Sequence, residues 1–226
     1  MEKSLINRIS KSEILITGML LSFIGGFLDA YTYILRGGVF ANTQTGNIIL
    51  LSFNIAKFNI NNILYYITPI ISFILGVLLS EFIKRKFINI KLLYWTQIIV
   101  LLETIILFLI GIFGNKISDF LVNTLISFVC SLQVSSFRKI NGLVYATTMC
   151  TGNLRSLCDK IYIFLFDKKK EAFKHSLIYI SIILMFIIGV IIGSLAANIL
   201  YHKSIFICCI ILLIILFILY EENKKD

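Results

Sequence analysis

The sequence predicts an all-α integral membrane protein with six transmembrane helices and two re-entrant half-helix segments arranged as an inverted repeat. Three observations favour this fold class. Hydrophobic residues make up 58% of the 226 residues and charged residues only 15%, a composition more apolar than that of soluble domains. Apolar runs long enough to cross a bilayer recur along the chain. Two polar segments interrupt these runs, and both contain the sequence Thr-Gly-Asn.

The first half of the chain is expected to hold three spans and the first polar segment. Its elements are, in order, a span at residues 14–35, the polar segment at residues 39–47, a short helix at residues 47–58, and spans at residues 63–83 and 92–113. The polar segment is too hydrophilic to face lipid, because unpaired backbone and amide groups are costly there. We therefore expect it to be buried in protein or to line a wet cavity.

The second half repeats this plan. It is expected to contain a span at residues 120–137, the second polar segment at residues 144–153, a helix at residues 153–166, and spans at residues 178–200 and 205–220. The pentapeptide at residues 73–77 (Phe-Ile-Leu-Gly-Val) has a counterpart at residues 186–190 (Phe-Ile-Ile-Gly-Val). We therefore predict that the whole chain, residues 1–226, forms one membrane domain with repeat A at residues 1–114 and repeat B at residues 115–226.

Loop charge distinguishes six crossings from eight. If both polar segments dip into the bilayer and return, 15 Lys and Arg side chains lie on the cytoplasmic side and four outside. If both cross, the division is 11 to 8. The positive-inside rule favours six crossings with both termini cytoplasmic, and it explains the net charge of +9 without a nucleic acid. In that topology the halves are inverted, so the two polar tips could meet near the membrane midplane.

Several motifs resemble a known family. The first-half motifs are Gly25-Gly26-Phe27-Leu28-Asp29-Ala30, Gly37-Gly38-Val39-Phe40 and Thr45-Gly46-Asn47, and the second-half ones are Thr151-Gly152-Asn153, Gly189 and Gly193. Together they resemble the YoaK-like bacterial membrane proteins, a family of uncharacterised function. The resemblance implies a multi-pass protein of the bacterial cell (inner) membrane. Where that family usually carries a Gln-Asn-Ala type motif, this chain has Gln133-Val134-Ser135-Ser136, which makes Gln133 the counterpart of Asp29.

Two carboxylates fall inside expected spans. Ionisable groups within a membrane are usually functional, so Asp29 is expected to bind a cation, to carry a proton for coupling, or to accept hydrogen bonds from the first polar tip. The alternative is an interfacial Asp29 that pairs with Arg36. Glu103 is expected to be a second proton or cation site, or a hydrogen-bonding group between helices.

The repeated Thr-Gly-Asn triplets open a helix in each half. Glycine allows a close backbone approach and helix-opening N–H groups attract polar groups, but Thr and Asn also cap helices. Ligand contact and capping therefore remain equally open. The residues expected to contact substrate are Asp29, Thr45, Gly46, Asn47, Gln133, Thr151, Gly152, Asn153 and Arg155.

Two further patterns on the expected helices can be explained by helix structure and packing. Arg155 and Asp159 are four residues apart and predict an intrahelical pair, unless Arg155 faces the cavity and attracts an anion. Gly189 and Gly193 form a Gly-x-x-x-Gly motif, which favours close helix packing.

The leading function is that of a secondary transporter or channel for a small polar or ionic solute, bound between the two Thr-Gly-Asn segments, with Asp29 and Glu103 supplying coupling. The rival is a non-transport membrane scaffold or partner-binding subunit. An enzyme comes third, because the chain has no His-Glu-x-x-His, Gly-x-Ser-x-Gly or Walker sequence. The expected partners are the lipid bilayer and the solute, with no nucleic acid, cofactor or metal, and a homo-oligomer is left open.

Overall fold

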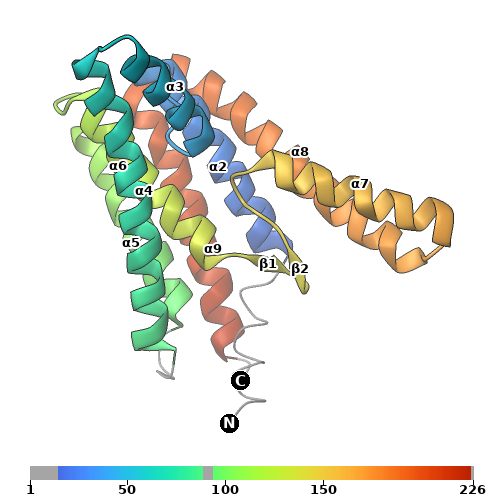
Figure 1. Ribbon diagram of the computed structural model, residues 1–226. Helices are drawn as coiled ribbons and strands as arrows, with labels where there is room; N and C mark the ends of the chain where they lie inside the picture. The colour runs from blue at the N-terminus through green and yellow to red at the C-terminus, as the bar shows by residue number, and fades with distance from the viewer. Residues whose placement is uncertain (1–14, 89–93, 225–226) are drawn as a thin grey trace.

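The computed structural model describes residues 15–88 and 94–224, whose regular structure is helical apart from one small hairpin (Figure 1). The elements are, in order, α2 (Leu15–Leu35), α3 (Gln44–Ala56), α4 (Ile60–Phe87), α5 (Trp95–Phe113), α6 (Asp119–Ser136), β1 (Lys139–Ile140), β2 (Leu143–Val144), α7 (Cys150–Asp167), α8 (Lys170–Leu200), the 3-10 helix η2 (Tyr201–Ile205) and α9 (Phe206–Lys224). The predicted all-α class is confirmed. Five of the basic residues counted in the loop-charge comparison, Lys3, Arg8, Lys11, Lys91 and Lys225, lie outside the described residues.

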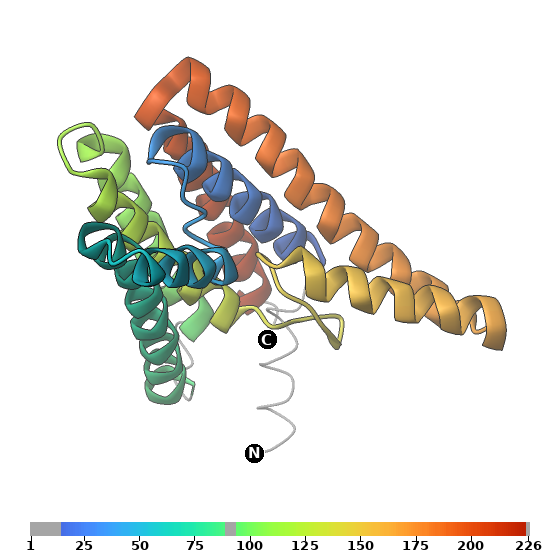
Figure 2. The same ribbon diagram turned by 45° about the horizontal axis from the view of Figure 1, so that its top comes forward.

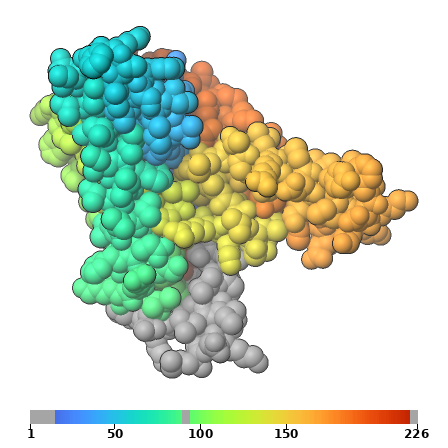
Figure 3. All heavy atoms as spheres, in the orientation of Figure 1, coloured from blue at the N-terminus to red at the C-terminus, as the bar shows by residue number. Residues whose placement is uncertain are grey.

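Helix α2 occupies the centre of a bundle. It packs along α8 and also contacts α6 and α9, while α4 packs on α6 and α5 on α9. Its apolar residues, from Leu21 to Tyr31, belong to the largest hydrophobic cluster. Helix α7 and the first half of α8 extend from this bundle as a helical arm, which Figures 2 and 3 show projecting to one side. The first span is therefore the helix against which the others are arranged.

Five apolar segments are long enough to cross a membrane. Four are the single helices α2, α4, α5 and α6, and the fifth runs from Lys170 to Glu221 and contains α8, η2 and α9. Helix α8 begins eight residues before the expected residue 178, because Ala172 and Ser176 are buried while Lys174 remains exposed. This amphipathic start packs against α7 and lacks the apolar run by which a span is recognised.

The hairpin was not predicted, although its turn has a sequence signal. Strands β1 and β2 are antiparallel, and between them Asn141 and Gly142 have φ angles of 48° and 78°. An Asn-Gly pair with two positive φ angles is typical of a type I′ turn. The hairpin holds the start of the second polar segment against α2, since Ile140 would overlap a β-carbon built at Gly18.

Arg36 ends α2 and joins three helices. Its guanidinium donates to Asp119 Oδ1 on α6 at 2.9 Å and to Tyr31 Oη at 2.9 Å. Its carbonyl oxygen accepts hydrogen bonds from Tyr65 Oη on α4 and Asn123 Nδ2 on α6. Arg36 is thus the structural anchor of this end of the bundle, and the alternative in which it pairs with Asp29 is not what the structure contains.

Candidate functional site

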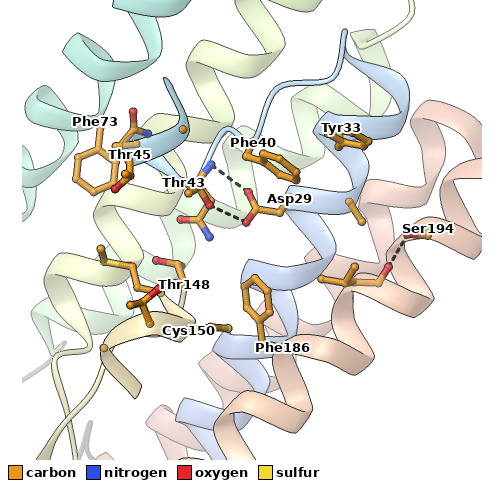
Figure 4. Close-up of a pocket in the computed structure, with 18 of the residues that line it drawn as sticks. Asp29, Tyr33, Phe40, Thr43, Thr45, Phe73, Thr148, Cys150, Phe186 and Ser194 are labelled. Atoms are coloured by element: carbon orange, nitrogen blue, oxygen red, sulfur yellow. Dashed lines mark hydrogen bonds between the residues drawn. The ribbon is translucent and has the colours of Figure 1, made fainter. Parts of the chain in front are cut away.

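A cavity of about 1030 Å³ lies where the two polar segments approach each other (Figure 4). Its walls come from α2, α4 and α8 and from the two polar segments with the first turns of α3 and α7. The lining residues are Asp29, Ala30, Tyr33, Ile34, Phe40, Asn42, Thr43, Gln44, Thr45, Gly46, Phe73, Thr148, Met149, Cys150, Thr151, Gly152, Phe186, Val190 and Ser194. Residues that are far apart in the sequence therefore line the same cavity.

Both polar segments touch the same turn of α2. A β-carbon built at Gly25 would lie 3.1 Å from the Thr147 carbonyl oxygen, 3.2 Å from Thr148 Cγ2 and 3.5 Å from Asn42 Nδ2. The glycine therefore leaves room for the two segments to approach α2 side by side. Their tips come together at this turn, one turn before Asp29.

Asp29 fastens the first polar segment to α2 and lines the cavity. Its side chain is 5% exposed. One carboxylate oxygen accepts the Asn42 N–H at 3.2 Å, and the other accepts the Thr43 hydroxyl at 3.4 Å (Figure 4). No described Lys, Arg or His forms an ion pair with it. The carboxylate thus retains acceptor capacity beyond these two neutral donors.

Asn47 and Asn153 have matching roles in the two halves. Asn47 Nδ2 donates to the Phe40 carbonyl at 3.3 Å, and Asn153 Nδ2 donates to the Ala146 carbonyl at 2.7 Å, each seven residues earlier in the chain. Both asparagines are buried and neither lines the cavity. Each amide holds the preceding polar segment against the start of the following helix. This geometry supports a structural role for both asparagines.

Gly46 and Gly152 differ from the asparagines because they do line the cavity. A β-carbon built at either glycine would meet no atom within 4 Å, and neither glycine has a positive φ angle. Thr45 and Thr151, the preceding residues, are exposed and line the same cavity. Neither packing nor backbone conformation within the described chain explains why glycine occurs at both positions.

The remaining candidate residues lie away from this cavity. Gln133 is buried and donates to the Leu21 carbonyl at 3.0 Å, so it ties α6 to α2. Arg155 is exposed on α7, and no ion pair joins it to Asp159 in the described structure. Glu103 is fully buried in α5, and neither of its carboxylate oxygens has a hydrogen-bond partner among the described residues.

The structure adds residues that the sequence did not single out. Asn42 lies within the first polar segment, so its polar neighbourhood was a usable signal. Cys150 opens α7 and lines the cavity. Phe73 on α4 and Phe186 on α8 begin the two matching pentapeptides, but as ordinary apolar residues of a span they carried no sign of facing a cavity.

Several buried polar atoms near the polar segments have no hydrogen-bond partner among the described residues. They are Asn42 Nδ2 and Oδ1, Thr147 Oγ1, Ser22 Oγ and Tyr145 Oη. These groups lie along one face of α2. Tyr145 Oη lies 3.1 Å from a β-carbon built at Gly18, Ser22 is one helical turn after Gly18, and Thr147 contacts the next turn at Gly25. An orphaned buried polar group costs about 1–3 kcal/mol, which water or a polar solute would offset.

Comparison with known proteins gives a family and no activity. Residues 17–218 match the family described as "Protein of unknown function (DUF1275)". The chain is also 28% identical over 196 residues to the UPF0700 transmembrane protein YoaK of Bacillus subtilis (strain 168), covering 83% of this chain and 86% of that protein. No solved structure matches the chain. The predicted resemblance to YoaK-like membrane proteins is confirmed.

Proposed function

The chain belongs to this DUF1275 family of transmembrane proteins, and from that premise we propose that it is a secondary transporter or channel for a small polar or ionic solute. The solute binds in the cavity between the two Thr-Gly-Asn segments, where Asp29, Thr45, Gly46, Thr151 and Gly152 meet. Asp29 and the buried Glu103 supply proton or cation coupling. The lipid bilayer and the solute are its partners, and no nucleic acid or cofactor is needed.

The proposed topology has six crossings with α3 and α7 re-entrant. Helices α8 and α9 count as separate crossings because the chain turns between them at η2, where Tyr201 has a φ angle of 50°. After this turn α9 runs back through the bundle (Figures 1 and 2). Both termini are then cytoplasmic in a bacterial inner membrane. The basic residues Lys84, Arg85 and Lys86 at the end of α4 fall on that same side, as the positive-inside rule requires.

The packing pattern supports the inverted repeat of residues 1–114 and 115–226. Under this repeat α2 corresponds to α6, α3 to α7, α4 to α8 and α5 to α9. The contacts are reciprocal: α2 packs on α8 as α6 packs on α4, α3 packs on α4 as α7 packs on α8, and α5 packs on α9. The equivalent hydrogen bonds of Asn47 and Asn153 extend the correspondence to single side chains. Inverted repeats with broken helices at mid-membrane are a recurring plan of transporters.

One observation carries the proposal: Gly46 and Gly152 face a shared cavity and have no packing partner in the described chain. A scaffold accounts for glycines that helices need for close contact, but these two glycines are not in such contacts. A ligand that approaches the backbone closely does account for them. The orphaned polar atoms along α2 agree with a hydrated interior.

An enzymatic role has less support. Asp29 is the one carboxylate and no histidine is found among the described residues that line the cavity. General acid–base catalysis uses positioned groups in complementary protonation states, for which the lining offers no second carboxylate or imidazole.

Water access to the cavity is testable with a native cysteine. Cys150 lines the cavity and Cys158 is exposed on α7, whereas Cys130, Cys208 and Cys209 are buried. In a Cys158→Ser background, a small charged methanethiosulfonate reagent should modify Cys150 in proteoliposomes and leave the buried thiols unmodified. A sealed helix interface, as the scaffold alternative requires, would leave Cys150 unmodified as well.

Flux itself is tested by filling the cavity. Gly46→Leu and Gly152→Leu place a side chain in the solute's space, at positions where an added β-carbon meets no described atom within 4 Å. Both variants should fold and lose uptake of small labelled solutes into proteoliposomes. Ser52→Leu is the matched control, because Ser52 is exposed on the same helix as Gly46 and does not line the cavity. Equal uptake by all three variants and the native protein would refute transport through this cavity.

A further inference from the structure

We infer that the solute is an organic cation, an amine or quaternary ammonium with an apolar body. This inference rests on the proposed function, because it names the class of solute that the same cavity accepts. Three independent properties of the lining point to it: its charge, its aromatic side chains and its size.

The lining is negative when its one carboxyl group is deprotonated. Asp29 is its carboxylate, and no Lys, Arg or His is among the described residues that line it. Arg155, the residue considered for attracting an anion, is exposed on α7 outside the lining, and Arg36 is paired with Asp119. In apolar surroundings an unpaired carboxylate strongly favours an ion of opposite charge. A cation therefore complements this cavity, and an anion does not.

Asn42 adds an acceptor next to this carboxylate. Its side chain is 3% exposed and lines the cavity, and its Oδ1 has no hydrogen-bond partner among the described residues. The Asn42 backbone N–H already binds Asp29 Oδ1, so the two side chains start from adjacent positions. A protonated amine carries up to three N–H donors and can donate to both the carboxylate and the amide oxygen, whereas a quaternary ammonium has no N–H and gains only the attraction of the charge. The orphaned amide oxygen is thereby explained.

Four aromatic side chains line the same cavity as the carboxylate. Tyr33 and Phe40 are stacked with ring centroids 4.8 Å apart, and Phe73 and Phe186 reach the cavity from α4 and α8. Figure 4 shows Phe40 and Phe186 on opposite sides of Asp29. The electron-rich face of an aromatic ring attracts organic cations by about 0.5–2 kcal/mol. The rings thus suit both the charge and the apolar body of such a solute.

The size of the cavity excludes a bare inorganic ion as the best-fitting occupant. At about 1030 Å³ the cavity is at the upper end of the range for drug-sized ligands. Hard metal cations require a close shell of six or more oxygen ligands. The side-chain oxygens of the lining come from α2, α8 and both polar segments, on Asp29, Tyr33, Asn42, Gln44, Ser194 and four threonines, while phenylalanine, isoleucine, valine and methionine side chains form much of the wall. No group of three His, Cys, Asp or Glu side chains that could hold a metal ion occurs among the described residues.

The test uses three probes with the same phenylethyl body and different charge: phenylethylamine, phenylethanol and phenylacetate. Binding to the purified full-length protein is measured as a rise in melting temperature with probe concentration. Phenylethylamine should stabilise the protein and the other two should not. Asp29→Asn should weaken amine binding at least tenfold, since a charge-assisted hydrogen bond is lost. Asp159→Asn, an exposed acid outside the lining, is the control and should bind the amine as the native protein does.

Each other outcome has a defined meaning. If phenylacetate or phenylethanol stabilises the protein as well as the amine does, the cation class is wrong, and loss of that binding in Gly46→Leu would show that the cavity still is a binding site. If Asp29→Asn binds the amine with native affinity, the inference is also overturned. If none of the probes binds up to millimolar concentration, the cation class falls, while the Cys150 modification and uptake measurements continue to test transport independently.

Discussion

The sharpest stability prediction concerns Gly189, where α8 packs directly against the backbone of α2. A β-carbon built at Gly189 would overlap the Phe23 carbonyl oxygen and would lie 2.9 Å from the Phe23 carbonyl carbon and 3.0 Å from its Cα. All three atoms belong to the backbone of α2, so no side-chain rotation relieves the overlap. The contact is reciprocal, since a β-carbon at Gly26 would overlap the Phe186 carbonyl oxygen. Gly189→Ala must therefore push the two helices apart.

The size of the effect follows from that displacement. Separating the helices by about 0.5–1 Å removes roughly a third of the dispersion energy at the contact. If the local interface contains about 50 heavy-atom pairs at about 0.15 kcal/mol each, as around one buried leucine, the loss is about 2.5 kcal/mol. Alanine returns up to about 1 kcal/mol through its better helix propensity. The net destabilisation is then about 1.5 kcal/mol, within the range for overpacked sites.

Gly152→Ala is the matched control, because it makes the same chemical change on α7 at a position where an added β-carbon has no described atom within 4 Å. It should leave the free energy of unfolding unchanged or raise it by up to about 1 kcal/mol. The measurement is reversible unfolding in mixed micelles with increasing denaturing detergent, followed by helical circular dichroism. Equal stability of Gly189→Ala and Gly152→Ala would refute the close α2–α8 contact on which the fold is built.

Three further predictions address the other polar groups. In the native protein, binding of phenyltrimethylammonium, measured by titration calorimetry, should strengthen as pH rises, because a deprotonated carboxylate attracts the cation. Asp29→Asn should abolish this pH dependence, and a pH dependence that survives the substitution contradicts the prediction. Arg36→Met should lower the free energy of unfolding by about 2 kcal/mol, which is less than for a fully buried ion pair because the Asp119 side chain is 49% exposed. Arg138→Met breaks the exposed pair with Glu81 and should lower the free energy of unfolding by under about 1 kcal/mol in the same assay. Glu103→Gln should keep or raise the melting temperature, since a carboxyl that has no hydrogen-bond partner among the described residues is replaced by a neutral group of the same shape. The variant should also reduce proton-driven uptake, and native uptake would remove Glu103 from coupling.

The sequence was sufficient for the parts of the fold that depend on hydropathy. The spans of α2, α5 and α6 were predicted to within a few residues at each end, because lipid forces long apolar runs into helices. The start of α8 was missed because an amphipathic helix that packs on α7 has no apolar run to reveal it. The Asn141-Gly142 hairpin was missed although its turn residues were readable from the sequence.

The candidate site could be predicted only as far as local chemistry reaches. The polar segments and Asp29 were conspicuous because they interrupt apolar sequence. Which member of each Thr-Gly-Asn triplet faces the cavity depends on how the following helix is rotated, and periodicity alone did not reveal it. The glycines and threonines turned out to line the cavity, while the asparagines point back to Phe40 and Ala146. The positions of Gln133 and Arg155 depend on contacts between distant helices in the same way.

A departure from the proposed internal symmetry accounts for a carboxylate on one wall of the cavity only. The two halves share the asparagine bonds, the glycines that face the cavity and the reciprocal helix contacts. They differ at Asp29, because Gln133, its counterpart under the proposed repeat, donates to the Leu21 carbonyl and does not line the cavity. A symmetric pair of carboxylates would hold two like charges near each other in apolar surroundings, which is strongly unfavourable. One half therefore supplies the charge and the other supplies neutral surface, and this asymmetry is what a single cationic group would recognise.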